Sequence, residues 1–271
     1  MKIFAIINES GSDSITAYLF YYEKPKKFYI ELTDNADEWN TPILLSSFAK
    51  KNIKTVNSHW SRIWVEHRIV PSDRQNLAQI LKDNGLKKYD EFDLLMLSNG
   101  RCAQDDFFLS PILYDDLPEN IKNRRAKKID DIVPLNNNKI LIFFRNGKIK
   151  LCDLQMICSP QSPTGILLKN NPEAVKNVRL QVGGYGICWG DNMSISDSEL
   201  YENGTTVPLT KNDFYSFVAN RVVNTAGAAE LLGCSRQNVE DLTKRKKITP
   251  IKEFENGKLF FKSEIEKREW E

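Results

Sequence analysis

The sequence holds few residues of the kinds that bind metals or form disulfides. It has only two histidines, His59 and His67, and no further nitrogen or thiol ligand lies close to them along the chain. A histidine-rich metal site is therefore not expected. The five cysteines are odd in number and include no C-x-x-C pair, which argues against a zinc ribbon and a disulfide scaffold. Reduced, buried thiols in a cytoplasmic protein are expected instead, at Cys102, Cys152, Cys158, Cys188 and Cys234.

Long apolar runs are also missing, since no stretch approaches the ~20 residues that span a bilayer. The opening MKIFAIINES lacks the apolar region and cleavage site of a signal peptide and is more typical of a strand. Charge is nearly balanced, because 38 Lys and Arg oppose 36 Asp and Glu, so any basic surface must be local. With 41% hydrophobic residues in 271, the chain is expected to form two or three folded domains.

The most informative feature is a helix-turn-helix pattern near the C-terminus. Thr225 is expected to cap a helix over 226–232, and Gly233 is expected to end it in a left-handed conformation. After a tight turn, Ser235 is expected to cap a second helix over about 236–245.

The first turn of this second helix carries side chains suited to reading bases. Arginine pairs bidentately with guanine, and asparagine or glutamine pairs with adenine, in the major groove. A basic run follows the helix and is the local positive surface that the overall charge requires. The predicted DNA-binding residues are Ser235, Arg236, Gln237, Asn238, Lys244, Arg245, Lys246, Lys247 and Lys258.

The segment after the helix pair predicts a hairpin. Two β-forming stretches, 248–254 and 258–262, surround Asn256-Gly257, which is a strong hairpin signal. The following Ser263-Glu264-Ile265-Glu266 has the pattern of a capping box at the start of a last helix. Such a hairpin beside a helix pair is typical of a wing.

The phrase AAELLGCSRQNVEDL, followed by the basic run and the hairpin, resembles the MerR-like and excisionase-like helix-turn-helix families over residues 222–270. The resemblance implies that the second helix enters the major groove and that the wing contacts the DNA backbone. Those roles would fall on Arg236, Gln237 and Asn238, and on Lys258. The winged module is then a DNA reader.

One departure from that pattern favours a different interpretation. Glu240 and Asp241 lie in the second helix and would repel phosphate if they faced it. The alternative is a helical appendage that binds another protein and exposes a solvated basic face. The agreement of cap, turn, basic run and hairpin favours DNA binding.

The middle of the chain, about 129–205, is rich in strand signals. The run at 139–145 is strongly β-forming, and Asn146-Gly147 predicts a hairpin turn back into 148–154. A second hairpin is expected around Gly183-Gly184.

This module resembles the domain-of-unknown-function 2442 family over 129–203. The phrases VPLNNNKILIFFRNGKIKLCDL and VRLQVGGYGICWGDNMSISDSELY carry the resemblance. It implies a small α+β module with no established chemistry that can be fused to a helix-turn-helix. Counterparts of the family pattern are Phe144, Asn146-Gly147, Asp153, Ile187, Trp189, Glu199, Leu200 and Tyr201.

An α+β module is expected over residues 1–115, with strands at 3–7, 15–22 and 27–32 and a helix over 42–51. Ser72 is expected to cap a helix over 73–84 that buries Leu77, Ile80 and Leu81.

A block within the N-terminal module has a resemblance of its own. Residues 60–109 resemble the N-terminal subdomain of HipA-like toxins, in which a helix and a following "LL…G" strand support the fold. In this chain the segment 94–100, LLMLSNG, matches that strand. The resemblance does not imply kinase activity, because no nucleotide loop or catalytic Asp-Asn pair is visible.

No matched catalytic set is expected, so the chain is interpreted as a protein without enzymatic activity or cofactor. Cys102 beside Asp105 lacks a histidine base near in sequence, and an Arg–Asp network that fixes a turn is the simpler reading. The acids Asp153, Asp191 and Asp197 sit where turns and helix caps use such side chains.

Together these patterns predict an α+β, multi-domain protein with modules at 1–115, 129–205 and 213–271. We expect a cytoplasmic DNA-binding transcriptional regulator, antitoxin-like or associated with a mobile element. It would act as a homodimer on double-stranded DNA and could bind a toxin-like partner through its first two modules. The alternative is a protein-interaction factor, such as a toxin neutraliser, with the last module as its docking domain.

Overall fold

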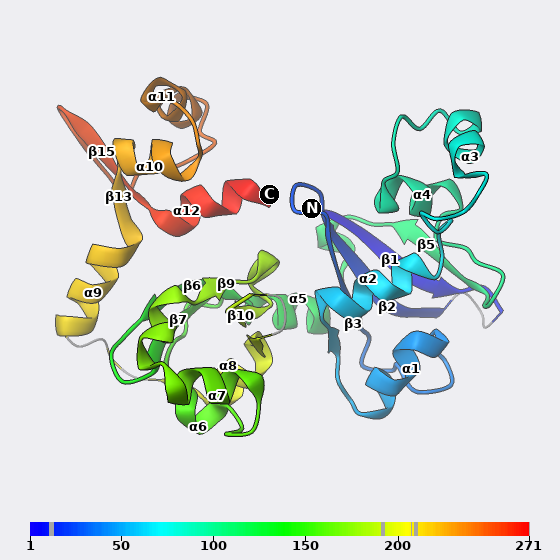
Figure 1. Cartoon of the computed structure of the whole chain (residues 1–271), viewed down its shortest axis with the longest axis horizontal. Coiled ribbons are helices and arrows are strands. Elements are labelled where there is room, and N and C mark those ends of the chain that lie inside the picture. Colours follow the sequence, from blue (N-terminus) through cyan, green and yellow to red (C-terminus); the bar gives the residue numbers. More distant parts are fainter. Residues whose placement is uncertain (11–13, 191–192, 207, 209–210, 271) are drawn as a thin grey trace. The chain divides into compact units, whose positions relative to one another are not determined.

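A computed structural model describes residues 1–10, 14–190, 193–206, 208 and 211–270. The chain divides into two compact units, Met1–Lys122 and Asn123–Glu271. Both units combine helices with antiparallel sheets, which confirms the expected α+β class (Figure 1). No described helix is both long enough and apolar enough to cross a membrane.

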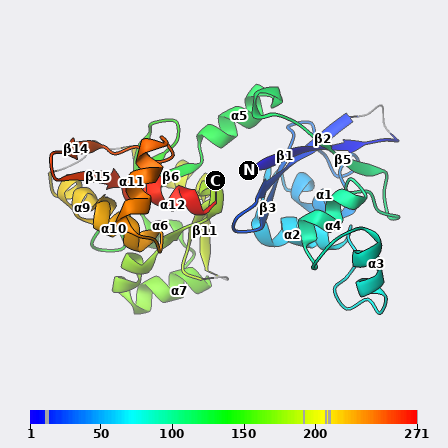
Figure 2. The same cartoon turned by 90° about the horizontal axis from the view of Figure 1, so that it is seen from above.

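The first unit is built on a five-stranded antiparallel sheet in the order β4-β3-β2-β1-β5. Alternate side chains of the sheet, such as Phe4 and Ile6, join a core with Trp64 and Leu95 from the helices. Helices α1, α2 and α4 lie on the same side of the sheet (Figure 2). The elements are β1 (Lys2–Asn8), β2 (Ser14–Tyr22), β3 (Lys27–Leu32), α1 (Ile43–Lys50), β4 (Thr55–Val56), α2 (Ser58–Glu66), α3 (Leu77–Asp83), α4 (Glu91–Leu97), β5 (Phe107–Pro111), η1 (Tyr114–Asp116) and α5 (Glu119–Ala126), the last of which runs into the second unit.

The three expected strands and the helix over 42–51 are confirmed, but the expected cap of the next helix is wrong. That helix, α3, begins at Leu77 and has no side-chain cap. The preceding residues form turns instead, in which the Arg74 amide donates to Pro71 O and the Leu77 amide to Arg74 O. The apolar stripe of α3 is half-buried, and none of its residues is fully buried.

The segment that resembles a HipA-type strand is a helix here. Asp90 caps α4 by accepting from the Phe92 and Asp93 amides, at 3.1 and 3.3 Å. Leu94 and Leu95 are buried at helical spacing, and the helix ends before Asn99, which has a positive φ. The strand expected from that resemblance is therefore wrong, because a strong cap and 3.6-residue periodicity determine this segment.

The second unit begins with the sheet β12-β8-β7-β6 and the smaller sheet β11-β10-β9. Both expected hairpins are confirmed. Gly147 has φ 81° in the first turn, and Gly183 and Gly184 both have positive φ in the second. The elements are β6 (Ile129–Pro134), β7 (Lys139–Phe144), β8 (Ile149–Asp153), α6 (Leu154–Ile157), α7 (Pro163–Asn170), η2 (Pro172–Asn177), β9 (Arg179–Leu180), η3 (Val182–Gly184), β10 (Gly186–Cys188), β11 (Ser194–Ser196), α8 (Asp197–Asn203) and β12 (Thr205–Thr206).

The rest of the second unit contains the helix pair and a three-stranded sheet in the order β13-β15-β14. The hairpin at Asn256-Gly257 is confirmed as β14 and β15, although the first strand is shorter than expected. Strand β13, which pairs with β15, was not expected. The elements are α9 (Lys211–Arg221), β13 (Val222–Asn224), α10 (Thr225–Leu231), α11 (Arg236–Lys244), β14 (Lys252–Phe254), β15 (Gly257–Phe261), α12 (Lys262–Glu266) and η4 (Lys267–Glu269).

Two expected helix caps in this part are wrong. Helix α10 is capped by Asn224, whose side-chain oxygen accepts from the Gly227 amide at 2.9 Å, and not by Thr225. Asn224 ends strand β13 and keeps an extended backbone, with ψ 177°, so it fills the cap position. Ser263 lies inside α12, which begins at Lys262 without a side-chain cap, because strand β15 continues to Phe261.

Candidate nucleic-acid interface

Helices α10 and α11 are joined by a tight turn. Gly233 follows α10 with φ 59°, and its amide donates to Glu230 O. The Cys234 amide donates to Ala229 O at 2.9 Å, which completes a Schellman ending. Ser235 then caps α11 through a 3.2 Å bond from the Asn238 amide. The expected roles of Gly233 and Ser235 are confirmed.

The inner face of α11 is fixed in a small core. Val239 is fully buried and packs with Ala228, Ile248, Phe260 and Ile265. This core joins both helices, strand β15 and the last helix, so it holds the orientation of α11 relative to the β14–β15 hairpin, the predicted wing. The opposite face of α11 is free to contact a ligand.

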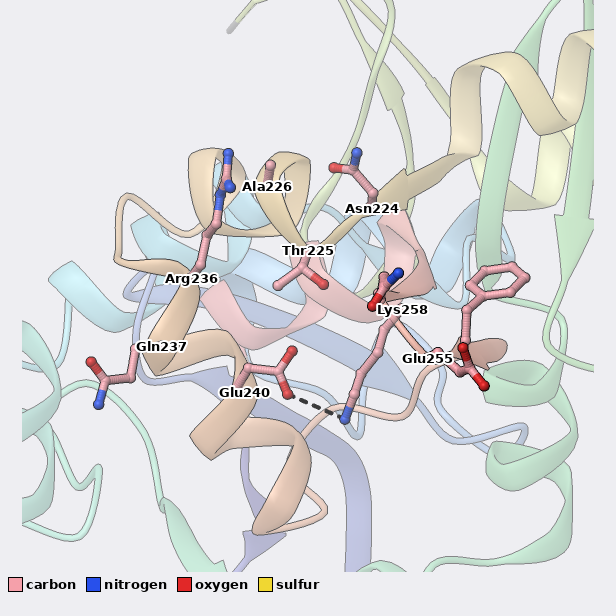
Figure 3. Close-up of a pocket in the computed structure, with 11 residues that line it drawn as sticks. Asn224, Thr225, Ala226, Arg236, Gln237, Glu240, Glu255 and Lys258 are labelled. Atoms are coloured by element: carbon pink, nitrogen blue, oxygen red, sulfur yellow. Dashed lines mark ion pairs between the residues drawn. The ribbon is translucent and has the colours of Figure 1, made fainter.

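The side chains expected to read bases occupy that free face. Arg236, Gln237 and Asn238 are exposed in the first turn of α11. In Figure 3, Arg236 and Gln237 point away from each other, so they would reach different parts of a bound surface. The Ser235 hydroxyl is already engaged as the cap, which leaves its second lone pair and its proton for a ligand.

The basic run lies at the other end of α11 and is exposed throughout. Arg245 ends the helix, and Lys246 adopts the left-handed conformation with φ 54°. The Lys247 amide donates to Leu242 O, so the run forms a second Schellman ending. In the described residues, no carboxylate lies within ion-pair distance of the run's four side chains, which are Lys244, Arg245, Lys246 and Lys247.

Lys258 has a different environment from the one expected for a free phosphate contact. Its Nζ lies 3.3 Å from Glu240 Oε2 and 3.1 Å from Glu253 Oε1. Its side chain is only 20% exposed. The hydrogen bond with Glu253, followed by the contact with Glu240, raises the pKa of Lys258 despite partial burial. A phosphate contact by Lys258 stays a prediction and would have to compete with two carboxylates.

A hollow of about 550 Å³ separates α11 from the wing (Figure 3). One wall carries Arg236 and Glu240, and the other carries Asn256 and Lys258. The Glu240–Lys258 ion pair crosses between the two walls. The hollow is therefore lined by hydrogen-bonding groups of both charges and is not a uniformly basic cleft.

Ion pairs that were not expected from the sequence connect this part to the middle module. Arg221, at the end of α9, lies 2.7 Å from Asp131 Oδ1 on β6 and 2.8 Å from Glu266 Oε2 on α12. Lys267 lies 2.5 Å from Asp130. Burial raises the pKa of Asp131, and the charge of Arg221 partly opposes this. Only the Asp-Asp pair at the start of β6 could have suggested such a contact.

The acids considered for catalysis have structural roles in the described residues. Asp105 pairs with Arg68 and accepts from the Phe107 amide, and Cys102 Sγ lies 3.6 Å from it. This confirms the Arg–Asp network. Asp153 caps α6, as expected at a cap position, whereas Asp197 does not cap α8.

The remaining acids complete this picture. Ser196 caps α8, and Asp197 forms a buried ion pair with Lys128. Asp191 lies outside the described residues. Among those described, no group of three or more His, Cys, Asp or Glu side chains is placed to hold a metal ion.

A family of proteins of unknown function, DUF2442, has a sequence model that matches residues 129–206. These residues contain the sheets from β6 to β12, so the expected resemblance of the middle module is confirmed. No curated protein and no solved structure has a significant match to the chain.

Proposed function

We propose that the protein is a DNA-binding transcriptional regulator that places α11 in the major groove of duplex DNA. The observation that carries this proposal is the juxtaposition of Arg236, Gln237 and Asn238 on the exposed turn of a helix whose other face is locked in a core. These are the side-chain types that pair with base edges. The tight turn between α10 and α11 and the adjacent β14–β15 hairpin support the winged helix-turn-helix interpretation.

The charge distribution supports the same proposal. The exposed run from Lys244 to Lys247 lies at the end of α11 and is suited to phosphate contacts. A single helix-turn-helix reads one half-site, so we propose a cytoplasmic homodimer on double-stranded DNA. An antitoxin-like or mobile-element role, with a toxin-like partner on the first two modules, remains part of the proposal.

The test is binding of the full chain to duplex DNA, followed by fluorescence anisotropy over a range of salt concentrations. Binding should weaken steeply with salt, because each neutralised phosphate releases condensed counterions. Arg236→Ala should cost roughly 1–3 kcal/mol on the preferred sequence and less on other sequences.

Arg179→Ala is the matched control, since Arg179 is an exposed arginine on β9, outside the helix pair. It removes the same charge and should leave the sequence preference unchanged. Equal losses from the two variants would contradict the assignment of α11 as the reading helix.

The alternative is docking of a partner protein on the same module. Phe254 and Ile251 on the wing are 51% and 43% exposed, and Lys258 is neutralised by carboxylates. A partly apolar wing suits a protein surface better than a DNA backbone. Absence of salt-dependent DNA binding by the full chain would favour this second function.

A further inference from the structure

We propose that Glu240 reads a base, accepting a hydrogen bond from the N4 amino group of cytosine, and that Lys258 positions its carboxylate. This inference rests on the proposed DNA binding and names the sequence class that the site recognises. It also gives a role to the acidic residue that departs from the pattern of a DNA-contacting helix.

The position of Glu240 places it beside the main reading residue. Arg236 and Glu240 are four residues apart on α11, so their side chains are neighbours on one face of the helix. Both line the hollow between α11 and the wing. If Arg236 reaches a base edge, Glu240 faces the same groove one turn along. Figure 3 shows the Glu240 carboxylate turned toward Lys258, with Gln237 on another side of the helix.

The ion pair leaves Glu240 able to accept a further bond. Lys258 Nζ approaches Oε2 of Glu240 at 3.3 Å. Within the described part of the chain, Oε1 has no hydrogen-bond partner. A carboxylate offers acceptor sites on both oxygens and no donor. Lys258 thus offsets the negative charge near phosphate and fixes the side chain, while one oxygen stays available.

The hydrogen-bonding groups that the bases present in the major groove then determine which base Glu240 can contact. In the major groove only cytosine N4 and adenine N6 are amino donors, and adenine also presents the N7 acceptor beside its donor. A carboxylate would be repelled by N7, so cytosine is the better match. With Arg236 suited to the acceptors of guanine, the helix would favour guanine and cytosine at neighbouring positions.

The second partner of Lys258 provides a matched control. Glu253 contacts the same Nζ at 3.1 Å but lies on β14 and does not line the hollow. Neutralising Glu253 changes the charge around Lys258 as much as neutralising Glu240 does. Only the Glu240 change removes the proposed base contact.

In the experiment, the full-length protein selects its preferred sequences from duplexes with a randomised central segment. The affinities of single-base variants of the enriched sequence are then compared. The wild-type protein should prefer cytosine at one position by about 5- to 150-fold. Glu240→Gln should move that preference toward adenine, because an amide can donate to N7 and accept from N6. Glu253→Gln should keep the cytosine preference.

Lys258 is tested as a positioning residue by two changes. Lys258→Met should reduce the cytosine preference, and Lys258→Arg should restore it. A general effect on folding or phosphate binding would not alter the base preference at one position alone. If Glu240→Gln kept the preference for cytosine and selected the same sequence at the other positions, this inference would be wrong. The proposed DNA binding would not be affected by that result. If the wild-type chain bound no duplex, the proposed function and this inference would both fail.

Discussion

Lys128, the residue before the middle module, forms an ion pair with Asp197 inside it, with Nζ and Oδ2 3.1 Å apart and side chains only 1% and 4% exposed. Lys128 follows α5 and Asp197 begins α8, so the pair connects segments that are far apart in the sequence. The Lys128 ammonium also lies 4.1 Å from the centre of the Tyr185 ring. The module that matches the DUF2442 family therefore has a charged centre beside its apolar core.

The first prediction concerns this pair. Lys128→Met should lower the free energy of unfolding by about 3–5 kcal/mol, because it removes a buried cation that lies 3.1 Å from the buried Asp197 carboxylate. The double variant Lys128→Met/Asp197→Leu should recover much of that loss, since neither member of this buried pair then carries a charge. Urea unfolding of the wild type, both single variants and the double variant measures the coupling. If the loss of stability in the double variant equalled the sum of the losses in the two single variants, the predicted coupling between Lys128 and Asp197 would be wrong.

The second prediction separates two neighbouring residues at the start of α10. Asn224→Ala should cost about 1 kcal/mol, because it removes the bond to the Gly227 amide. Thr225→Val should cost much less, since in the described residues the Thr225 hydroxyl is buried and has no hydrogen-bond partner. Thermal unfolding of both variants checks this. A larger loss from Thr225→Val would restore Thr225 as the cap.

The third prediction is a pH dependence in the first unit. Burial tends to raise the pKa of Asp90, but the hydrogen bond from Lys26 and the amides of Asp93 and Phe92 outweigh it, so the pKa is lowered from 3.8. The stabilisation by ionised Asp90 is therefore complete above pH 3.8 and is lost as the pH falls through the folded-state pKa.

Two variants test this pH dependence. Asp90→Ala should cost about 1 kcal/mol at neutral pH, and its difference from wild type should shrink on acidification. Asp90→Asn keeps a capping side chain but cannot titrate. Its unfolding free energy should therefore vary less than that of the wild type below pH 4. A constant difference between wild type and Asp90→Asn across this range would contradict the assignment.

Local chemistry explains which parts of the fold were predictable. The Asn146-Gly147 hairpin was found because this pair favours turns that need a positive φ, which Gly147 adopts. The Asn256-Gly257 hairpin was found by the same signal, although neither of its two residues has a positive φ and Gly257 already pairs with Phe254. The cap of α10 was misplaced because strand β13, a tertiary feature, holds Asn224 extended. The Glu240–Lys258 pair was missed because it joins helix α11 to strand β15, and no local sequence pattern predicts a contact between these two residues.

The last prediction concerns Arg221, which joins α9 to the middle module and to α12. Removing its charge by Arg221→Leu should destabilise the second unit by about 3 kcal/mol or more at neutral pH, because Asp131 stays buried without its cation.

The pKa of Asp131 is already raised, so its ionisation disfavours folding. A raised folded-state pKa means that stability is lost as the pH rises from 3.8 through the folded-state value. The loss in Arg221→Leu should therefore be smaller at pH 4 than at pH 7. Adding Asp131→Asn should remove this difference and recover part of the stability. Chemical unfolding at both pH values measures it, and a loss that is equal at pH 4 and pH 7 would show that Arg221 acts through packing and not through the charge of Asp131.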